Sequence, residues 1–339
     1  MKAVAYRQAK PIDQPDSLLD VTLPDPVPTG RDLLVRVEAI AVNPVDTKVR
    51  AGVDPKGADK VLGWDAAGTV VATGPDATLF RPGDAVFYAG ALDRPGANSA
   101  LHLVDERLVG RKPATLGFAE AAALPLTSIT AWELLFDRLG VRIGKPAQAG
   151  SLLVIGGAGG VGSIATQLAR RLTGLTIIAT ASTPESQAWS REMGAHHVIN
   201  HREALAPQIK AIVPGGVDYI LALTQTDQHF PAFAEIVAPQ GHIACIDDPT
   251  GPLDIVALKR KSVSFHWELM FTRSLYQTPD MIAQHRLLNE VADLVDAGLI
   301  TSTVNRNLGP INAVHLREAH ALIESGRSVG KIVLSGFGD

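Results

Sequence analysis

Apolar residues follow two different patterns along the chain. Within residues 1–110, short apolar runs alternate with turn clusters rich in proline, glycine and aspartate; the runs lie at 33–37, 69–72 and 85–88. Short strands separated by such turns predict a small, partly open β-barrel. A helical pattern follows over 117–139, and we expect Pro125 to interrupt it, because proline lacks a backbone N–H and clashes with the preceding turn.

From Ser151 onward, apolar runs of strand length alternate with segments of helical period. We expect strands at 152–156, 175–181, 197–200, 217–223 and 241–247, with helices between them. This alternation predicts a doubly wound parallel sheet, in which ligands bind at the carboxyl ends of the strands. Three further elements are expected later in the chain: a strand over Ser262–Phe271, an amphipathic helix over 281–297 and a closing strand over 331–335.

A glycine-rich stretch joins the first of these strands to a helix. Gly157, Gly159 and Gly162 have the spacing G-x-G-x-x-G, with Gly160 and Val161 inside it, and the residues that follow have a helical apolar period. Bare backbone N–H groups at a helix N-terminus suit a pyrophosphate, whereas a side chain there would hold the anion away. A turn that only lets strand and helix pack would need one or two glycines, so the stretch favours a dinucleotide site.

The end of the second strand of this sheet indicates which dinucleotide binds. NAD-selective sites carry Asp or Glu about 20 residues past the glycines, on the ribose 2′-hydroxyl. The segment Ala179–Pro184 has no carboxylate, which predicts NADPH rather than NADH. Ser182 and Ser186 are candidate donors to the 2′-phosphate, with Arg191 as added charge. Alternatively, the same segment caps the next helix, and the two roles are compatible.

Composition narrows the class of protein. The 339 residues suggest two domains, and a net charge of −4 with both signs mixed argues against nucleic acid or an anionic membrane as the main partner. Cys245 is the single cysteine, which excludes an internal disulfide and a cysteine-rich zinc site and fits a reducing compartment. No apolar run approaches the roughly 20 residues of a membrane span. We expect a cytoplasmic protein that acts on a small-molecule substrate.

Further motifs occur in order along the chain: 42–47 (VNPVDT), 63–70 (GWDAAGTV), 81–86 (RPGDAV), 121–128 (AAALPLTS), 193–200 (MGAHHVIN) and 330–334 (GKIVL). Together with the glycine stretch, this set resembles the medium-chain dehydrogenase/reductase superfamily, in particular its quinone oxidoreductase branch and the zinc-type alcohol dehydrogenase-like proteins. The resemblance implies a GroES-like barrel domain over 1–122, completed by 272–339. It also implies a Rossmann domain over 123–271 and a cleft that holds a nicotinamide cofactor.

The resemblance also assigns residues to the cofactor. Thr127 and the segment Cys245-Ile246-Asp247 should approach the nicotinamide, and Lys331 belongs to the cofactor-binding set. His201 falls where relatives often carry a tyrosine near the adenine. For Cys245, the simpler interpretation is a small buried apolar residue rather than a catalyst.

The same resemblance raises the question of a metal. Zinc enzymes of the superfamily hold the catalytic ion with a cysteine in the first motif and a Gly-His-Glu in the second, where this chain has Asn43 and Trp64-Asp65. A catalytic zinc site needs about three Cys, His or carboxylate ligands, so we predict that no catalytic zinc is bound. Three histidines close in sequence could form a rival metal site: His196, His197 and His201. Adjacent residues on a strand point to opposite faces, so we prefer to interpret them as surface histidines.

Hydride transfer from NADPH to a quinone, an enone or a related carbonyl compound is the expected reaction. The cofactor carries the chemistry, and the protein stabilises negative charge on the carbonyl oxygen. Candidate donors are the Asn43 amide and Lys48, and Asp46 should hold the loop through backbone hydrogen bonds. The simpler interpretations are a turn at Asn43-Pro44 and a solvated charge at Lys48. Two other functions stay open: a zinc-dependent alcohol dehydrogenase and a non-enzymatic dinucleotide-binding sensor.

Aromatic and apolar residues suggest a substrate pocket. The candidates come from both halves of the chain: Trp64, Phe87, Tyr88, Trp267, Met270 and Phe271. The alternative is that Trp64 and Phe87 belong to the barrel core. The expected strand over Ser262–Phe271 looks like a sheet edge, and such edges invite pairing. In the superfamily this strand pairs across a two-fold axis, so the resemblance implies a homodimer.

Overall fold

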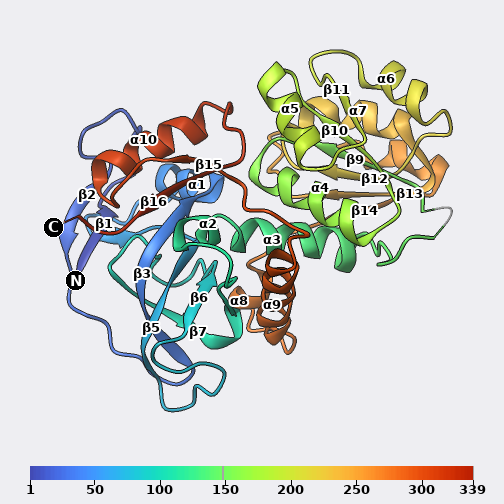
Figure 1. Cartoon of the computed structure of the whole chain (residues 1–339). Coiled ribbons are helices and arrows are strands. Elements are labelled where there is room, and N and C mark those ends of the chain that lie inside the picture. The colour runs from blue at the N-terminus through green and yellow to red at the C-terminus, as the bar shows by residue number, and fades with distance from the viewer. Residues whose placement is uncertain (147–148, 339) are drawn as a thin grey trace. The chain divides into compact units, whose positions relative to one another are not determined.

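The computed structural model describes residues 1–146 and 149–338, which form two compact units (Figure 1). Unit 1 contains Met1–Ile129 and Phe271–Asp339, and unit 2 contains Thr130–Met270. The chain passes from unit 1 into unit 2 within helix α3 (Pro125–Trp132). Both ends of the sequence therefore build unit 1, while the middle of the sequence builds unit 2.

Unit 1 contains an open, mostly antiparallel sheet with the strand order β15-β16-β3-β5-β6-β8, to which β7 is added by pairing with β3. A second sheet has the order β2-β1-β4. The strands are Lys2–Tyr6 (β1), Leu19–Thr22 (β2), Asp32–Val42 (β3), Lys60–Val61 (β4), Ala66–Thr73 (β5), Ala85–Tyr88 (β6), Leu101–Asp105 (β7), Val109–Arg111 (β8), Val304–Asn307 (β15) and Lys331–Ser335 (β16). The three apolar runs expected as strands lie in β3, β5 and β6, and the closing strand is confirmed as β16.

The pairing of β16 with β3 joins the two ends of the chain. The strands are antiparallel, with Ile332 opposite Val42 and Val333 opposite Ala41. This register brings Lys331, the first residue of β16, to the end of β3, where the loop toward Asn43 begins. Two motifs from opposite ends of the sequence therefore meet in unit 1.

Helices complete unit 1. They are Pro44–Gly52 (α1), Phe118–Ala122 (α2), Thr272–Leu275 (α8), Ile282–Asp296 (α9) and Ala313–Glu324 (α10), with a short 3₁₀ turn at Glu106–Leu108. The helix expected over 281–297 is confirmed as α9. The segment expected as one interrupted helix over 117–139 forms α2, then α3 from Pro125, then a π-helical turn at Glu133–Arg138. Proline suits the first turn of a helix, so Pro125 begins α3 instead of kinking it.

Unit 2 is a six-stranded, all-parallel sheet with the order β11-β10-β9-β12-β13-β14. Its strands are Ser151–Ile155 (β9), Thr176–Thr180 (β10), His197–Ile199 (β11), Val217–Ala222 (β12), Val237–Cys245 (β13) and Ser264–Trp267 (β14). Each strand expected in this region is present. The order reverses between β9 and β12, and such a switch point is where open α/β sheets bind ligands.

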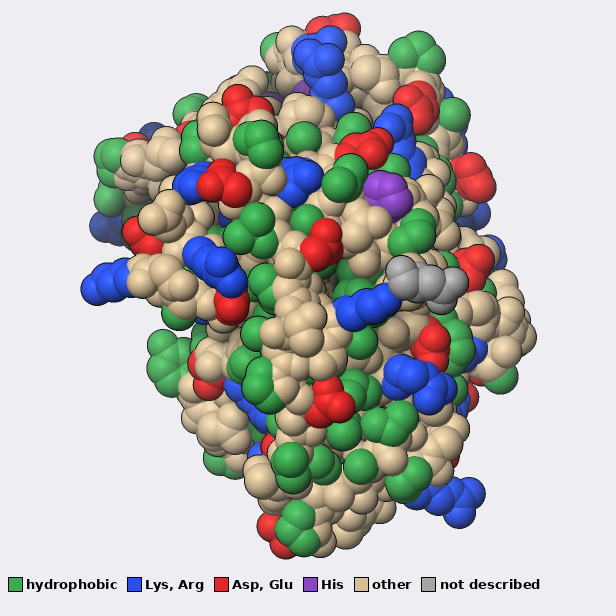
Figure 2. Space-filling model, turned by 90° about the vertical axis from the view of Figure 1, so that its left-hand side faces the viewer, with side chains coloured by type: hydrophobic (Ala, Val, Ile, Leu, Met, Phe, Trp, Pro, Cys, Tyr) green, Lys and Arg blue, Asp and Glu red, His purple; other side chains and the backbone are tan. Residues whose placement is uncertain are grey.

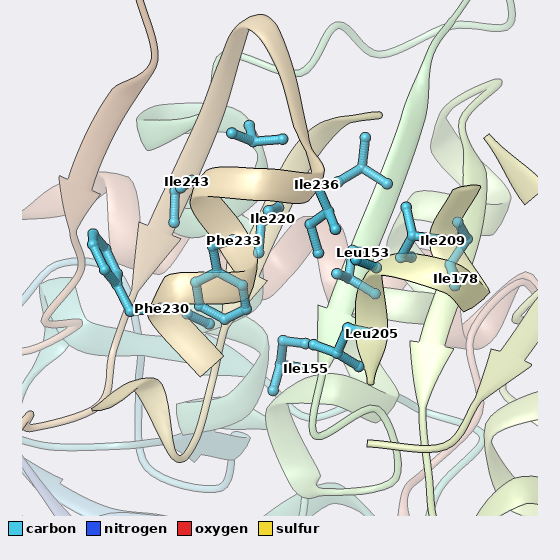
Figure 3. Close-up of a cluster of buried hydrophobic side chains, with 14 of the residues drawn as sticks. Leu153, Ile155, Ile178, Leu205, Ile209, Ile220, Phe230, Phe233, Ile236 and Ile243 are labelled. Atoms are coloured by element: carbon cyan, nitrogen blue, oxygen red, sulfur yellow. The ribbon is translucent and has the colours of Figure 1, made fainter. Parts of the chain in front are cut away.

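Helices cover both faces of the unit 2 sheet (Figure 1). Gly160–Leu172 (α4) packs against β9 and β10, and Pro184–Glu192 (α5) follows β10. On the other face, Leu205–Ile212 (α6) and Thr226–Ile236 (α7) bury an apolar cluster against the sheet; Figure 3 shows its side chains, among them Leu153, Ile209, Ile220, Phe233 and Ile243. Each such buried side chain contributes roughly 1.5–3 kcal/mol, so this cluster holds the strands in place behind their carboxyl ends.

The surface carries charges of both signs. Figure 2 shows Lys, Arg, Asp and Glu side chains interspersed over one face of the molecule. Among the described residues, no helix is both long enough and apolar enough to cross a membrane.

Candidate functional site

Most of the predicted cofactor residues lie at one edge of the unit 2 sheet, where its parallel strands end; we call this the carboxyl edge. The glycine stretch follows β9, Ser182 follows β10, His201 follows β11, and Cys245 ends β13. Pairing of Thr180 with Ile199 and of Ala222 with Cys245 keeps these strand ends level. The sheet therefore brings together residues that are spread over about a hundred positions of sequence, as ligand binding at a switch point requires.

The glycines of this stretch are not equivalent. A Cβ at Gly157 would lie 2.6 Å from the Ala179 Cβ, and one at Gly162 would lie 2.4 Å from the Gly156 carbonyl oxygen. Both positions need glycine for packing between strand and helix. A Cβ at Gly159 would meet only the Gly156 oxygen, at 3.4 Å, so the protein itself leaves room for a side chain there. A bare backbone at Gly159 fits the close approach of a pyrophosphate.

The N-terminus of α4 has the chemistry of an anion site. Gly159 is its N-cap residue and supplies no side-chain cap, and the first turn contains no acidic residue. Helix geometry leaves the first N–H groups without intrahelical acceptors, and the helix dipole adds partial positive charge. The Ser163 hydroxyl donates to the Gly159 carbonyl at 2.7 Å, and the Trp189 indole donates to that hydroxyl at 2.8 Å, which fixes the turn.

The end of β10 carries no carboxylate, but its serines differ in role. Ser182 is half-buried. The Ser186 hydroxyl donates to the Thr183 carbonyl at 3.0 Å and accepts from the Thr183 N–H at 3.1 Å, so it closes a capping box at the start of α5. The capping alternative therefore describes Ser186. Arg191 lies in the last turn of α5, at the opposite end of that helix from Ser182.

Arg202 is a basic residue at this edge that the sequence reasoning missed. It follows His201 in the turn after β11, and its side chain is exposed. Because β10 and β11 are neighbours and the Ala181 N–H donates to the Ile199 carbonyl at 2.9 Å, the chain leaves both strands side by side. A cation three residues after β11, the strand that neighbours β10, was the available signal.

Cys245 is the last residue of the buried end of β13, and Ile246 and Asp247 follow the strand. Cys245 is fully buried, and burial raises the pKa of its thiol, which suits a neutral apolar residue and not a nucleophile. Its sulfur lies 3.4 Å from the Thr226 hydroxyl. The Asp247 carboxylate accepts the Thr226 N–H at 3.1 Å and so binds the first residue of α7.

Unit 1 gathers its motif residues into a buried polar cluster of Asn43, Asp65 and Lys331. The Lys331 ammonium donates to Asn43 Oδ1 at 2.5 Å and to Asp65 Oδ2 at 2.9 Å. The Asn43 amide donates to Asp65 Oδ2 at 2.8 Å, and Asp65 Oδ1 accepts the Leu126 N–H at 2.8 Å. Burial raises the pKa of Asp65, while the Lys331 ammonium and these donors act in the opposite direction.

Asp46 holds the loop around this cluster, as predicted. Its carboxylate accepts the Asn43 N–H at 2.6 Å and the Gly63 N–H at 3.2 Å. Burial raises the pKa of Asp46 to about 7, against the effect of the two backbone donors. The two motifs of unit 1 are thus joined by one carboxylate.

Other predicted roles in unit 1 find different geometry. The Asn43 side chain is 1% exposed and its amide donates to Asp65 and to the Ala41 carbonyl, so both of its N–H groups are used within the protein and not offered to a substrate. Lys331 is 3% exposed, and its ammonium donates to the Asp65 carboxylate. Lys48 lies on the exposed face of α1.

The residues proposed as a substrate pocket are mostly core. Trp64, Phe87, Tyr88 and Phe271 are each at most 2% exposed. The Trp64 indole donates to the Ala91 carbonyl at 3.0 Å and packs edge-to-face on Phe271. The alternative of a barrel core therefore describes Trp64 and Phe87, and Tyr88 and Phe271 are equally buried, because large aromatic rings favour whichever apolar interior the fold provides. Thr127 is also buried, and its hydroxyl donates to the Leu124 carbonyl at 3.0 Å.

Comparison with known proteins identifies the family of this chain. Two family models match: an alcohol dehydrogenase GroES-like domain over residues 29–131 and a zinc-binding dehydrogenase over residues 193–334. A zinc-type alcohol dehydrogenase-like protein from Staphylococcus aureus (strain COL) is 44% identical over 311 residues, which cover 91% of this chain and 92% of that protein. This chain belongs to the medium-chain dehydrogenase/reductase superfamily.

Further superfamily members extend the likeness. A quinone oxidoreductase from Pseudomonas aeruginosa is 31% identical over 314 residues, covering 91% of this chain and 92% of that protein. The solved structure of a candidate zinc-dependent alcohol dehydrogenase from Rhizobium etli CFN 42 has a TM-score of 0.96 and 56% identity, over 100% of this chain and 99% of its own. A mycobacterial protein solved with NADPH has a TM-score of 0.84 and 29% identity, over 99% of each chain. The chain is an oxidoreductase with a GroES-like domain and a Rossmann domain.

The zinc-related names of the superfamily do not fit the donor set of this member. Asn43 Oδ1 accepts a hydrogen bond from the Lys331 ammonium, and both Asp65 carboxylate oxygens accept hydrogen bonds from donors within the protein. The Trp64 indole N–H donates to a backbone carbonyl. Within residues 1–146 and 149–338, no group of three or more His, Cys, Asp or Glu side chains is arranged to hold a metal ion. Of the three histidines considered for a rival site, His196 and His197 are exposed and His201 is half-buried.

Proposed function

We propose that this protein is a zinc-independent, NADPH-dependent oxidoreductase that transfers a hydride to a quinone, an enone or a related carbonyl compound. One observation carries the proposal: the uncapped N-terminus of α4 begins at Gly159, a residue that has no side chain although the protein leaves room for one. A dinucleotide pyrophosphate explains both features. The quinone oxidoreductase relative and the structural neighbour solved with NADPH support this choice of cofactor and substrate class.

The chemistry follows from what the side chains are able to do. A bound nicotinamide supplies the hydride, and reduction of a conjugated carbonyl then requires only hydrogen-bond donors for the developing oxyanion. Alcohol oxidation would in addition require a metal or a base for the hydroxyl proton. Asp46 and Asp65 are fully buried and bound to internal donors, so neither serves readily as that base.

Cofactor preference is assigned to the strand ends beside the glycine turn. Ser182 supplies a hydroxyl, and Arg202 supplies a positive charge from the neighbouring strand end. The segment Ala179–Pro184 has no carboxylate to repel a 2′-phosphate. His201 stands between these groups in the chain and is the candidate for contact with the adenine. Together these residues favour NADPH over NADH.

A panel assay tests the proposal. Oxidation of NADPH and of NADH is measured with quinones, enones, aldehydes and alcohols, with and without a chelator, and zinc is quantified in the purified protein. The proposal expects NADPH-dependent reduction of quinones or enones that the chelator leaves unchanged. Chelator-sensitive alcohol oxidation with about one zinc per chain would identify a zinc-dependent dehydrogenase instead. Tight NADPH binding without turnover of any compound would identify a sensor.

The edge strand of unit 2 supports a homodimer in this proposal. β14 is the last strand of the sheet, and Trp267 and Leu269 are 55% and 49% exposed beside it. An unpaired strand edge with exposed apolar side chains favours pairing with a second copy across a two-fold axis. Light scattering during gel filtration should give twice the chain mass, and Trp267→Asp should reduce it to the monomer mass.

A further inference from the structure

Lys331 is a buried cation with every donor used. Its side-chain nitrogen lies 3.1 Å from the Val42 carbonyl oxygen, 2.5 Å from Asn43 Oδ1 and 2.9 Å from Asp65 Oδ2. An ammonium has three N–H donors, so these three oxygens saturate it. Its side chain is 4% exposed and that of Asp65 is 0% exposed, which makes the pair an internal one.

Asn43, Asp65 and Lys331 are each hydrogen-bonded to the other two. Asn43 accepts from Lys331 and donates to Asp65, and Lys331 donates to Asp65 directly. By the motif comparison, Asn43 stands where zinc enzymes of the superfamily carry a cysteine ligand, and Asp65 stands where they carry the glutamate of Gly-His-Glu. The ammonium therefore touches two of the motif positions that surround the metal in those relatives. Its positive charge offsets the Asp65 carboxylate, which would otherwise be buried without a counter-ion.

We propose that the Lys331 ammonium is the resident cation of this centre and holds Asn43 and Asp65 in place without a metal ion. Through Asp65, which accepts the N–H of Leu126, its hold extends to the first turn of α3, beside Thr127. Lys331 is thus a positioning residue, and its predicted contact with the cofactor is replaced by this internal role. The inference rests on the zinc independence in the proposed function but not on its substrate or cofactor.

A thermodynamic cycle tests the charge pairing. Lys331→Met keeps the length of the side chain and removes the charge, which leaves Asp65 buried and unpaired. We expect its melting temperature to fall by on the order of 10 °C. Adding Asp65→Asn should recover a large part of that loss, because the double variant has no unpaired charge. The matched control is the pair Lys210 and Glu235, which are 57% and 53% exposed; the same cycle there should show coupling of at most about 2 °C.

Chemical rescue separates a cation from a packing role. Lys331→Ala opens space at the ammonium position, and propylammonium chloride should raise its melting temperature by several degrees more than sodium chloride does. The same salt should leave wild type and Lys331→Met unchanged, because both fill the space. These readouts need neither NADPH nor substrate, so they stand even if the panel assay finds no turnover.

Two results would overturn the inference. One is a Lys331→Met protein that melts like wild type but has a raised KM for NADPH, which would make the lysine a direct cofactor ligand. The other is a cycle in which the losses from Lys331→Met and Asp65→Asn simply add, with no response of Lys331→Ala to propylammonium. Either result would show that the positive charge does not hold the centre.

Discussion

The two motif regions of the chain treat their polar atoms in opposite ways. At the carboxyl edge of unit 2, the first turn of α4 has no capping side chain, and a Cβ at Gly159 would meet only the Gly156 oxygen, at 3.4 Å. In unit 1, Asn43, Asp65 and Lys331 bind one another and are 1%, 0% and 3% exposed. Both regions come from short motifs, but only the first leaves hydrogen-bonding groups available to a ligand.

The contrast shows that a motif acquires its chemistry from the partners that the fold supplies. Backbone N–H groups at a helix N-terminus have no acceptor within the helix, so they stay available wherever no side chain caps them. Side-chain donors in unit 1 find acceptors because β16 pairs with β3 and places Lys331 beside them. Substitutions at the edge of unit 2 should therefore alter ligand affinity, and those in the unit 1 cluster should alter stability.

Gly159→Val should break the ligand side of this contrast most strongly. The new side chain would occupy the space assigned to the pyrophosphate, and we expect the Kd for NADPH to rise about 100-fold, or ~2.7 kcal/mol. The melting temperature should change by less than about 3 °C, because a Cβ at this position meets only the Gly156 oxygen, at 3.4 Å. Calorimetric titration and thermal denaturation measure the two effects.

The matched control is Gly215→Val, since nothing lies within 4 Å of a Cβ at Gly215. It should alter neither NADPH affinity nor melting temperature. Unchanged NADPH affinity in Gly159→Val would show that the pyrophosphate does not rest on this turn.

Asn43→Ala should have the reverse profile. Lys331 would lose one buried acceptor and Asp65 one buried donor. The free energy of unfolding should fall by about 2–3 kcal/mol, with little change in the Kd for NADPH. Denaturant titration measures the loss. Asn200→Ala in unit 2 is the control, because its amide bonds to an exposed Glu203 and should cost less than about 1 kcal/mol. An equally small loss in Asn43→Ala would mean that the unit 1 cluster contributes little to stability.

Mild acid should destabilise unit 1 through His102. Burial lowers the pKa of this ring to about 4 from an ordinary value of 6.5. Since the unfolded chain binds the proton more readily, the stability that the neutral ring contributes is full above pH 6.5 and is lost as the pH falls toward 4. At pH 5 the loss is about 2 kcal/mol.

Burial favours the neutral ring, whereas the hydrogen bond to the Pro95 carbonyl acts in the opposite direction on the pKa. His102 Nε2 lies 2.9 Å from the Pro95 carbonyl, which only accepts, and Nδ1 lies 3.1 Å from the Tyr88 hydroxyl. Denaturant titrations at pH 7 and pH 5 should show a smaller drop for His102→Gln than for wild type. His197→Gln, at an exposed position of unit 2, should keep the full drop. Equal drops in wild type and His102→Gln would assign acid sensitivity to other groups.

Sequence patterns predicted the fold well because its signals are local. Apolar runs such as 152–155 are buried on both faces, and glycine follows them at the turn into a helix, so the parallel sheet was evident. The interruption expected at Pro125 is also present, since α2 ends at Ala122 and α3 begins at Pro125. The π-helical turn at Glu133–Arg138 was not predicted.

The candidate sites divide in the same way. The glycine turn is a local backbone feature and was predicted residue by residue. One partner of Asn43, Lys331, lies 288 positions away, and no spacing rule connects them. Residue type also does not distinguish a substrate pocket from a buried core, because Phe87 and Tyr88 are apolar enough for either. Their burial depends on the pairing of their strand, β6, with β5 and β8.

Arg202→Ser sharpens the contrast within unit 2, with the smallest expected effect. Arg202 is exposed in the turn after β11, beside the end of β10, where no carboxylate stands. Loss of one charge-assisted contact with the 2′-phosphate should raise the KM for NADPH about tenfold, or ~1.4 kcal/mol, and leave the KM for NADH unchanged, because NADH lacks that phosphate. Arg191→Ser removes an equal charge at the far end of α5 and should change neither value. An equal loss with both cofactors would place Arg202 at the pyrophosphate or the adenine, and the preference for NADPH would then depend on Ser182.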